Sequence, residues 1–357
     1  MSEVKSKIKR VSALKQRGKV LRDTNPLLAV FQWGCNHMMN EAELVSDQPL
    51  ILDRDFKAFS KVQVHNQYYN EQELPNKFKV KEYCPVVFKS LRHRFGEDPA
   101  DYLTSICDGQ IYGGKSTGKG GGDIYYTHDH RLVIKTLAKE EVASFHHTFK
   151  QYYSYIVECD GDTLLARYLG MYRITVHEKE TYMVVMNSIR PVGIPTHRLY
   201  DLKGSKVDRK ASDKERAKDL PCLKDIDFEE AQERLYLGGD TETFKETLKR
   251  DVQFLEKHNL MDYSLLVAIH DCNEQTPGEI DRDVDVYHVG PHAKDLKADP
   301  KRLYFIGIID VLTVYSTRKR AAHAAKTAKH GARAEISTVK PDQYAKRLLE
   351  FVSSMLA

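Results

Sequence analysis

The glycine-rich stretch from Gly109 to Gly122 constrains the fold of this 357-residue chain more than any other feature. It contains the pattern GxxxxGKS at 109–116, which is typical of a P-loop NTPase. A P-loop serine opens a helix whose N-terminus faces the phosphates, but Ser116 is followed by Thr-Gly-Lys-Gly-Gly-Gly, a very poor helix start. The P-loop therefore stays an alternative that a helix over 115–125 would favour.

A hairpin that closes over a nucleotide fits the same stretch better. Residues 123–126 and 131–137 are rich in β-branched and aromatic residues and flank a polar turn, so they predict two antiparallel strands. In protein kinases a glycine-rich turn of this kind covers ATP, and a lysine on the next strand pairs with its phosphates. Lys135 has that position. The glycines expected near the phosphates are Gly113, Gly114, Gly118 and Gly120.

Two aspartates lie in or beside apolar runs that predict strands, Asp262 at 262–270 and Asp310 within 303–314. Burying a lone carboxylate is costly, so each should face a cation, a hydroxyl or a metal. Phosphoryl transfer needs one acid that positions the acceptor hydroxyl, one that holds Mg²⁺ and a lysine that offsets phosphate charge. The combination with Lys135 predicts this chemistry, although a structural salt bridge would also explain either acid alone.

Composition excludes several classes of protein. With 41% apolar and 30% charged residues, the chain reads as a soluble globular protein. Its longest apolar run, 303–315, is too short for the roughly 20 residues of a membrane-spanning helix. The basic N-terminus has no apolar segment behind it, so no signal peptide is expected. Six scattered cysteines without a CxxC pair predict reduced thiols. A net charge of +4 is too small a surplus to argue for nucleic acid by itself, and no nucleic-acid partner is expected.

Charge is distributed unevenly along the chain. Residues 1–22 hold eight Lys/Arg against Glu3, which predicts a disordered basic tail. Residues 316–340 hold seven Lys/Arg against Glu335. Each basic residue near an anionic leaflet contributes about 1 kcal/mol, so this segment predicts contact with an anionic membrane surface.

The order of the expected elements indicates an α+β protein with two lobes, built from antiparallel sheets with flanking helices. Helices are expected at 139–158, over the apolar spacing 244–255, and from Pro341 onward, with a strand pair at 171–176 and 181–186. The charged segment 203–220 is expected to be exposed, and 271–299 is expected to be a mobile linker. The predicted lobes are 23–186 and 187–357.

Several longer motifs resemble the phosphatidylinositol phosphate kinases, and the similarity runs from about residue 25 to the C-terminus. They are Asp201–Ser205 with Arg209, Met261–Leu266, Ile308–Leu312 and Lys79–Pro85. The resemblance implies a bilobal kinase-like fold, ATP and Mg²⁺ as cofactors and a phosphoinositide lipid as substrate. It further implies a homodimer whose flat basic face docks on anionic membranes. The implied location is cytoplasmic and peripheral on inner membrane faces, with a nuclear pool left open.

The resemblance also assigns roles to individual residues. It identifies Lys135 as the lysine that binds the ATP phosphates, Asp262 as the catalytic aspartate and Asp310 as the Mg²⁺ ligand. Lys203 is expected to reach the phosphates, and Met186 and Asn187 fall in the adenine-binding hinge. Glu141 is the chosen partner of Lys135, whereas Ser144 occupies that place in another alignment.

The family divides by substrate. Type II members phosphorylate phosphatidylinositol 5-phosphate at the 4-position, and type I members phosphorylate the 4-phosphate at the 5-position. Residues 320–339 resemble type II, with Ala322 where type I carries Glu. The expected substrate or membrane contacts are Arg209, Arg318, Lys319, Arg320, Ala322, Lys326 and Lys329. The hinge at 184–189 resembles type I instead, so a 4-phosphate 5-kinase and the choice between ATP and GTP stay open. A weakly active scaffold that binds phosphoinositide membranes is a separate alternative.

Overall fold

The computed structural model describes residues 23–42, 50–65, 74–114, 122–190, 192–272, 288–289, 302–315 and 339–357. The chain divides into two compact units. The first comprises residues 1–143, 149–153 and 167–188, and the second comprises 144–148, 154–166 and 189–357. The main division falls two residues after the predicted boundary at 186/187, but the sequence did not indicate that parts of 144–166 group with the second unit.

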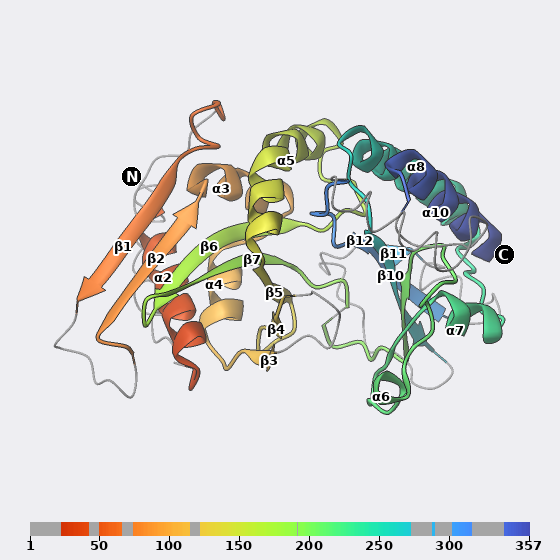
Figure 1. Ribbon diagram of the computed structural model, residues 1–357, viewed down its shortest axis with the longest axis horizontal. Coiled ribbons are helices and arrows are strands. Elements are labelled where there is room, and N and C mark those ends of the chain that lie inside the picture. The colour runs from red at the N-terminus through yellow and green to blue at the C-terminus, as the bar shows by residue number, and fades with distance from the viewer. Residues whose placement is uncertain are drawn as a thin grey trace, which may run out of the picture. The chain divides into compact units, whose positions relative to one another are not determined.

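The first unit is built on a seven-stranded antiparallel sheet with the strand order β1-β2-β6-β7-β5-β4-β3 (Figure 1). Its strands are β1 (Phe59–His65), β2 (Lys77–Tyr83), β3 (Tyr112–Gly114), β4 (Ile124–Tyr126), β5 (Leu132–Leu137), β6 (Tyr168–Val176) and β7 (Lys179–Asn187). The β4–β5 and β6–β7 pairs confirm the predicted hairpin and the predicted strand pair.

Three helices, α2 (Pro26–Ala42), α3 (Pro85–Arg94) and α4 (Pro99–Cys107), cover one face of this sheet. Asp98 begins α4 because its carboxylate accepts the amides of Ala100 and Asp101, with Pro99 at the first helical position. The helix α2 approaches the sheet closely at Gly34, where a Cβ would lie 2.6 Å from Val80 Cγ1. The longer helix α5 spans Lys139–Glu158, so the bounds predicted for it are confirmed.

The second unit holds a five-stranded sheet with the order β11-β12-β10-β8-β9. Its strands are β8 (Arg198–Leu202), β9 (Cys222–Leu223), β10 (Ser264–Asp271), β11 (His288–Val289) and β12 (Arg302–Ile309). All pair antiparallel except β8 with β9. The mixed α+β class expected from the sequence, with largely antiparallel sheets and flanking helices, is confirmed.

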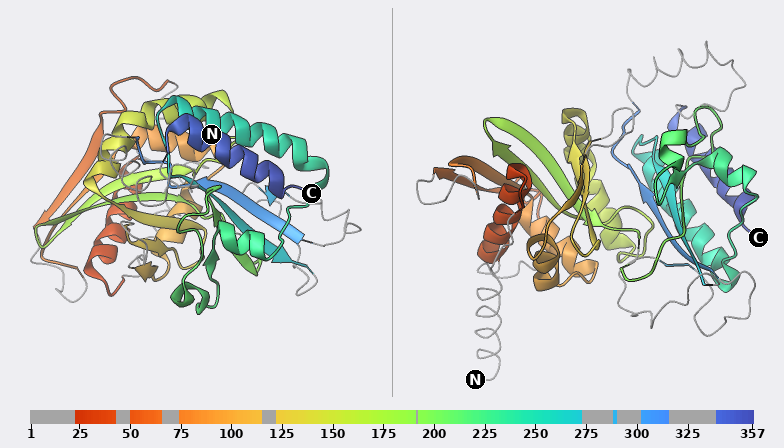
Figure 2. Two further views of the ribbon diagram at one scale, coloured as in Figure 1. Left: turned by 45° about the vertical axis from the view of Figure 1, so that its right-hand side comes forward. Right: turned by 90° about the horizontal axis from the view of Figure 1, so that it is seen from below.

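Two long helices, α8 (Thr241–Lys257) and α10 (Pro341–Met355), lie side by side along one face of this sheet (Figures 1 and 2). Both have the 3.6-residue apolar spacing of an amphipathic helix. The residues that this spacing buries are Phe244, Leu248, Val252, Leu255, Tyr344, Leu348 and Met355. The short helices α6 (Asp213–Arg216), α7 (Asp225–Glu230) and η1 (Gly238–Asp240) complete the unit.

Three predictions about local structure need correction. The strand expected to reach residue 314 ends at Ile309, because Asp310 has the left-handed φ of +61° and turns the chain. The expected mobile linker 271–299 contains the strand β11, which pairs with β12. Most of the other linker residues lie outside the described residues, and so does the predicted basic tail 1–22. The exposure expected for 203–220 is wrong at several positions of its first half, where Ser205, Arg209 and Ala211 are buried, and right at Lys206, Asp208 and Lys210.

The six cysteines all fall in the described part of the chain and carry free thiols. No helix among the described residues is long and apolar enough to cross a membrane.

Candidate active site

Lys135 lies on β5 between its neighbours β4 and β7, opposite Ile124 on one side and Val184 on the other. Its ammonium Nζ is 3.1 Å from Glu141 Oε1, in the first turn of α5. The second oxygen of Glu141 accepts the amide of Ala138 at 2.9 Å, so this carboxylate also fixes the start of the helix. A largely buried lysine needs such a partner, and the prediction that Glu141 provides it is confirmed.

The glycine-rich stretch begins in a hairpin. Strand β3 pairs antiparallel with β4, which places Gly114 opposite Ile124. Gly113 has φ +112°, and a Cβ there would lie 2.4 Å from the carbonyl oxygen of Ile124, so only glycine fits. Since residues 124–126 form a strand, the helix that a P-loop requires over 115–125 is contradicted, although residues 115–121 lie outside the described part.

The predicted adenine-binding hinge is the end of β7, at Met186 and Asn187. The Asn187 amide nitrogen Nδ2 donates to Glu97 at 3.4 Å, and its main-chain amide donates to Arg167 at 3.3 Å. The side-chain oxygen of Asn187 is buried and finds no hydrogen-bond donor among the described residues. Such an acceptor suits a ligand that carries an amino group, as the adenine ring does.

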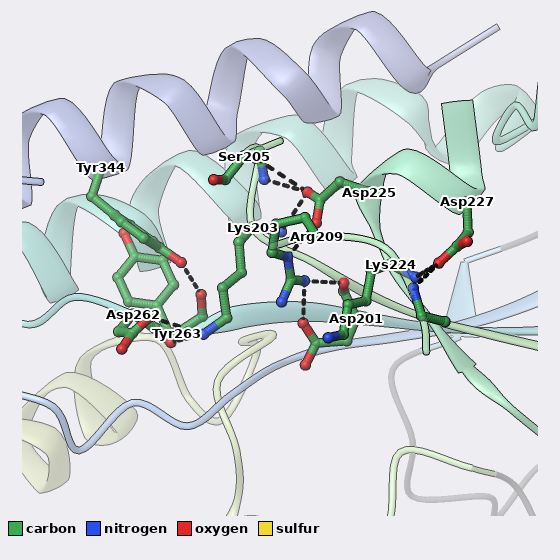
Figure 3. Close-up of polar contacts among 12 residues, drawn as sticks. Asp201, Lys203, Ser205, Arg209, Lys224, Asp225, Asp227, Asp262, Tyr263 and Tyr344 are labelled. Carbon is green, nitrogen blue, oxygen red and sulfur yellow. Dashed lines mark hydrogen bonds and ion pairs between the residues drawn. The ribbon is translucent and has the colours of Figure 1, made fainter. Parts of the chain in front are cut away.

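In the second unit, Lys203 and Asp262 meet at one end of the sheet (Figure 3). The ammonium of Lys203 lies 3.0 Å from Asp262 Oδ1 and donates to the main-chain oxygen of Asp262 at 2.6 Å. The pairing register explains the encounter: Leu202 ends β8 opposite Leu265, so the residue after β8 lies next to the residues that precede β10. Two residues from separate predicted motifs are therefore neighbours.

Asp310 lies at the same end of this sheet. Its neighbour Ile309 ends β12 opposite Ser264, the first residue of β10. Beyond these strands the chain segments stay paired, because the amide of Met261 donates to the carbonyl of Thr313 at 2.9 Å. The ends of β8 and β12 and the start of β10 thus gather three of the predicted functional residues of this unit, Lys203, Asp262 and Asp310.

Mg²⁺ bound with a nucleotide commonly takes one or two carboxylates and completes its shell with phosphate oxygens and water. The exposed carboxylate of Asp310 fits that requirement. No cluster of three or more His, Cys, Asp or Glu among the described residues could hold a metal ion by itself.

The loop that carries Lys203 is held by Asp225, a residue that the sequence analysis missed. One oxygen of the Asp225 carboxylate accepts three successive amides, from Lys203 at 2.9 Å, Gly204 at 2.7 Å and Ser205 at 3.3 Å (Figure 3). Successive amides that converge in this way form an anion-binding nest. Asp225 is buried in the first turn of α7, a position that favours an acid, and this was the available signal.

Arg209 completes this support. Its Nε donates to the other oxygen of Asp225 at 2.6 Å, and its Nη2 lies 2.5 Å from Asp201 Oδ1. Burial acts to lower the pKa of Arg209, but the two carboxylates outweigh it and raise the pKa. These contacts give Arg209 a structural part in holding the loop, and they do not support the substrate or membrane contact expected from the resemblance.

A second buried carboxylate, Asp251, was also missed. It lies on the apolar side of α8, where it accepts the hydroxyl of Thr163 at 2.9 Å, the amide of Leu164 at 2.6 Å and the hydroxyl of Tyr155. Leu164 in turn accepts the amide of Ile308 at 2.6 Å, two residues before Asp310. Asp251 therefore anchors the segment that borders β12. The sequence signal for Asp251 was an acidic residue on the side of the helix where the apolar spacing predicts buried residues.

The remaining predicted site residues lie outside the described residues. They are Gly118, Gly120, Arg318, Lys319, Arg320, Ala322, Lys326 and Lys329.

Comparison with known proteins gives consistent matches over most of the chain. Residues 106–288 and 287–355 match the family described as phosphatidylinositol-4-phosphate 5-kinase. Phosphatidylinositol 5-phosphate 4-kinase type-2 beta of Homo sapiens is 45% identical, with 96% of this chain and 92% of the relative covered. The type-2 gamma protein of Danio rerio is 42% identical, with 99% and 95% covered. The type-2 alpha protein of Mus musculus is 42% identical, with 99% and 96% covered.

Proposed function

This chain belongs to the phosphatidylinositol phosphate kinase family, and we propose that it acts as a phosphatidylinositol 5-phosphate 4-kinase. It would transfer the γ-phosphate of ATP to the 4-hydroxyl of phosphatidylinositol 5-phosphate and yield the 4,5-bisphosphate. The names of the relatives support this substrate, since all three are 5-phosphate 4-kinases. The pairing of Lys203 with Asp262, at the end of the sheet that also carries Asp310, is the observation that carries the chemistry.

The second unit supplies the groups that act on the reacting hydroxyl. The carboxylate of Asp262 is partly exposed, so it can accept the proton of the inositol hydroxyl as that oxygen attacks the γ-phosphorus. A bond forms between the inositol oxygen and the γ-phosphorus, the bond to the bridging oxygen breaks, and ADP leaves. Lys203 offsets the negative charge that gathers on the phosphates. Asp310 would hold Mg²⁺, which neutralises phosphate charge when it is bound.

The first unit supplies groups suited to ATP. Lys135, oriented by its ion pair with Glu141, would bind the phosphates, and the hairpin at Gly113 would cover them. The side-chain oxygen of Asn187, which has no donor among the residues that the structure describes, suits the adenine amino group. These features support ATP as the phosphate donor.

A row of cations supports the proposed membrane-facing surface. Lys61, Lys81 and Arg173 lie directly opposite one another on β1, β2 and β6, an arrangement of like charges that destabilises a sheet and that the ion pair of Arg173 with Glu180, at 3.0 Å, offsets only in part. Burial lowers the pKa of Lys81, and Arg173 and Lys61 lower it further. An anionic lipid surface would relieve this repulsion. A homodimer and a peripheral, cytoplasmic location, implied by the family resemblance, are part of the same proposal.

The experiment is a lipid-kinase assay of the purified chain on vesicles that contain either the 5-phosphate or the 4-phosphate substrate. Wild-type protein should prefer the 5-phosphate, and Ala322→Glu should shift the preference toward the 4-phosphate. Unchanged preference in Ala322→Glu would remove that residue as the determinant. Binding of wild-type protein to both vesicles without phosphate transfer would favour a scaffold instead.

A further inference from the structure

The helix α10 touches both segments that carry functional side chains in the second unit. Tyr344, in its first turn, is fully buried, and its hydroxyl donates to the main-chain oxygen of Tyr263, the residue after Asp262 (Figure 3). The two tyrosine rings pack edge to face, with centroids 4.8 Å apart. Tyr344 thus contacts the backbone beside the proposed catalytic carboxylate without being part of the site's surface.

The backbone at Asp262 needs such support. Its φ of +66° is left-handed, a conformation that a residue with a side chain adopts only when surrounding contacts hold it. On one side the amide of Met261 donates to Thr313 at 2.9 Å. On the other side the hydrogen bond from Tyr344 fixes the carbonyl of Tyr263. The turn that aims the Asp262 carboxylate is therefore held at both ends.

The same helix also bears on the loop that carries Lys203. Gly204 has φ +63°, and a Cβ there would lie 3.0 Å from the carbonyl oxygen of Arg347 and 3.3 Å from the Cα of Leu348. The backbone of this loop consequently rests directly on α10, while the Asp225 carboxylate binds its amides. One helix is a common support for both partners of the Lys203–Asp262 pair.

We propose that Tyr344 is a positioning residue for phosphate transfer: through its hydrogen bond to Tyr263 it holds the Asp262 turn in the geometry that brings the carboxylate to Lys203. This inference rests on the proposed function, in which Asp262 accepts the hydroxyl proton. Burial raises the pKa of Tyr344 well above its ordinary value, so the hydroxyl keeps its proton and stays a donor.

The test is Tyr344→Phe, which removes one hydroxyl and keeps the ring. The matched control is Tyr304→Phe on β12, where an equally buried hydroxyl accepts the amide of Tyr236 at 3.3 Å near the opposite end of the strand. We expect kcat of Tyr344→Phe to fall about tenfold, with KM for ATP within about twofold of wild type. Deuterium exchange should quicken at 260–264 and stay unchanged at 266–270. The control should keep kcat and the exchange at 260–264.

The contrary results are equally defined. Three results would each overturn the positioning role: a wild-type kcat in Tyr344→Phe, unchanged exchange at 260–264, or an equal loss of kcat in Tyr304→Phe. If the wild-type protein phosphorylates the lipid, the proposed function stands even when one of these results is found. If wild type phosphorylates no lipid, the proposed function fails, and exchange at 260–264 alone decides the inference. Gly204→Ala is a second variant, because its Cβ would press on α10; it should also lose kcat, and full activity would contradict the shared support.

Discussion

The ammonium of Lys203 is 3.0 Å from Asp262 Oδ1 and 2.6 Å from the main-chain oxygen of the same residue. The two residues are 59 positions apart and meet because β8 and β10 are antiparallel neighbours. The lysine therefore fixes both the backbone and the side chain of the aspartate. A carboxylate held in this way needs little reorganisation when it accepts a proton.

Replacing Asp262 by asparagine should remove nearly all turnover and leave nucleotide binding intact. Asparagine keeps an oxygen that accepts from Lys203 but removes the group that takes the proton, so kcat should fall by roughly 10³-fold. Lipid product formation measures the loss, and calorimetry should give a Kd for ATP within about twofold of wild type. Asp213→Asn, an exposed site on α6, is the control. Normal turnover in Asp262→Asn would remove it from the catalytic step.

Glu141→Gln tests the partner of Lys135. The ion pair at 3.1 Å becomes a weaker hydrogen bond from the Lys135 ammonium to a neutral amide oxygen, so we expect kcat/KM for ATP to fall by about tenfold. Glu140→Gln makes the same change one residue away, at an exposed position, and should leave kcat/KM unchanged. Steady-state kinetics with varied ATP separates the two variants. Equal values for both would show that the ion pair does not orient the lysine.

Asp225→Asn tests the nest that holds the Lys203 loop. The change removes a buried charge from three amides and from Arg209, so the free energy of unfolding should fall by about 3 kcal/mol, and kcat should fall with it. Asp227→Asn removes another buried carboxylate of α7, which binds the amides of Ala211 and Lys224 away from the loop. It should lower stability and preserve kcat. Equal losses of kcat would contradict a specific role for Asp225.

The buried carboxylate of Asp251 should make the free energy of unfolding depend on pH. Burial raises its pKa to about 6, against the lowering effects of Tyr155, Leu164, Thr163 and Arg250. The unfolded chain, with an aspartate pKa of about 3.9, loses this proton first as pH rises. Between about pH 4 and 6 the native state therefore binds more protons, and this group's contribution to stability falls with rising pH, by at most about 3 kcal/mol.

The measurement is the difference in free energy of unfolding between wild type and Asp251→Asn at pH 4.5 and pH 7. Because both proteins share every other titrating group, the difference isolates Asp251. The advantage of wild type over the variant should be smaller at pH 7. A difference that stays constant between the two pH values would show that Asp251 is ionised throughout.

The sequence predicted the elements that have a clear period. The hairpin before Lys135, the helix α5 and the apolar faces of α8 and α10 follow from alternation and from 3.6-residue spacing. The positions of Asp262 and Asp310 beside strands were visible for the same reason. The sequence did not show that Asp262 and Asp310 lie at the same end of one sheet. That proximity depends on the strand order β12-β10-β8, which pairs segments that are distant in the chain.

The structural roles of the supporting residues escaped prediction because they depend on tertiary contacts. Arg209 lies in a segment dense in charge, which favours exposure, yet two carboxylates allow the guanidinium to be buried. Asp225 binds amides about 20 positions earlier in the chain, and Tyr344 binds a carbonyl 81 positions away. A local pattern can mark such a residue, as the first turn of α7 marks Asp225, but it does not identify the distant groups that the residue binds.

The position of the transferred phosphate on the inositol ring tests the central claim most directly. Vesicles with phosphatidylinositol 5-phosphate and γ-labelled ATP should yield the 4,5-bisphosphate with the label on the 4-oxygen, and the Asp262→Asn variant should yield almost none. Vesicles with the 4-phosphate should give little product. Label on the 5-oxygen of the 4-phosphate substrate, with the 5-phosphate left unreacted, would contradict the proposal and make the chain a 5-kinase.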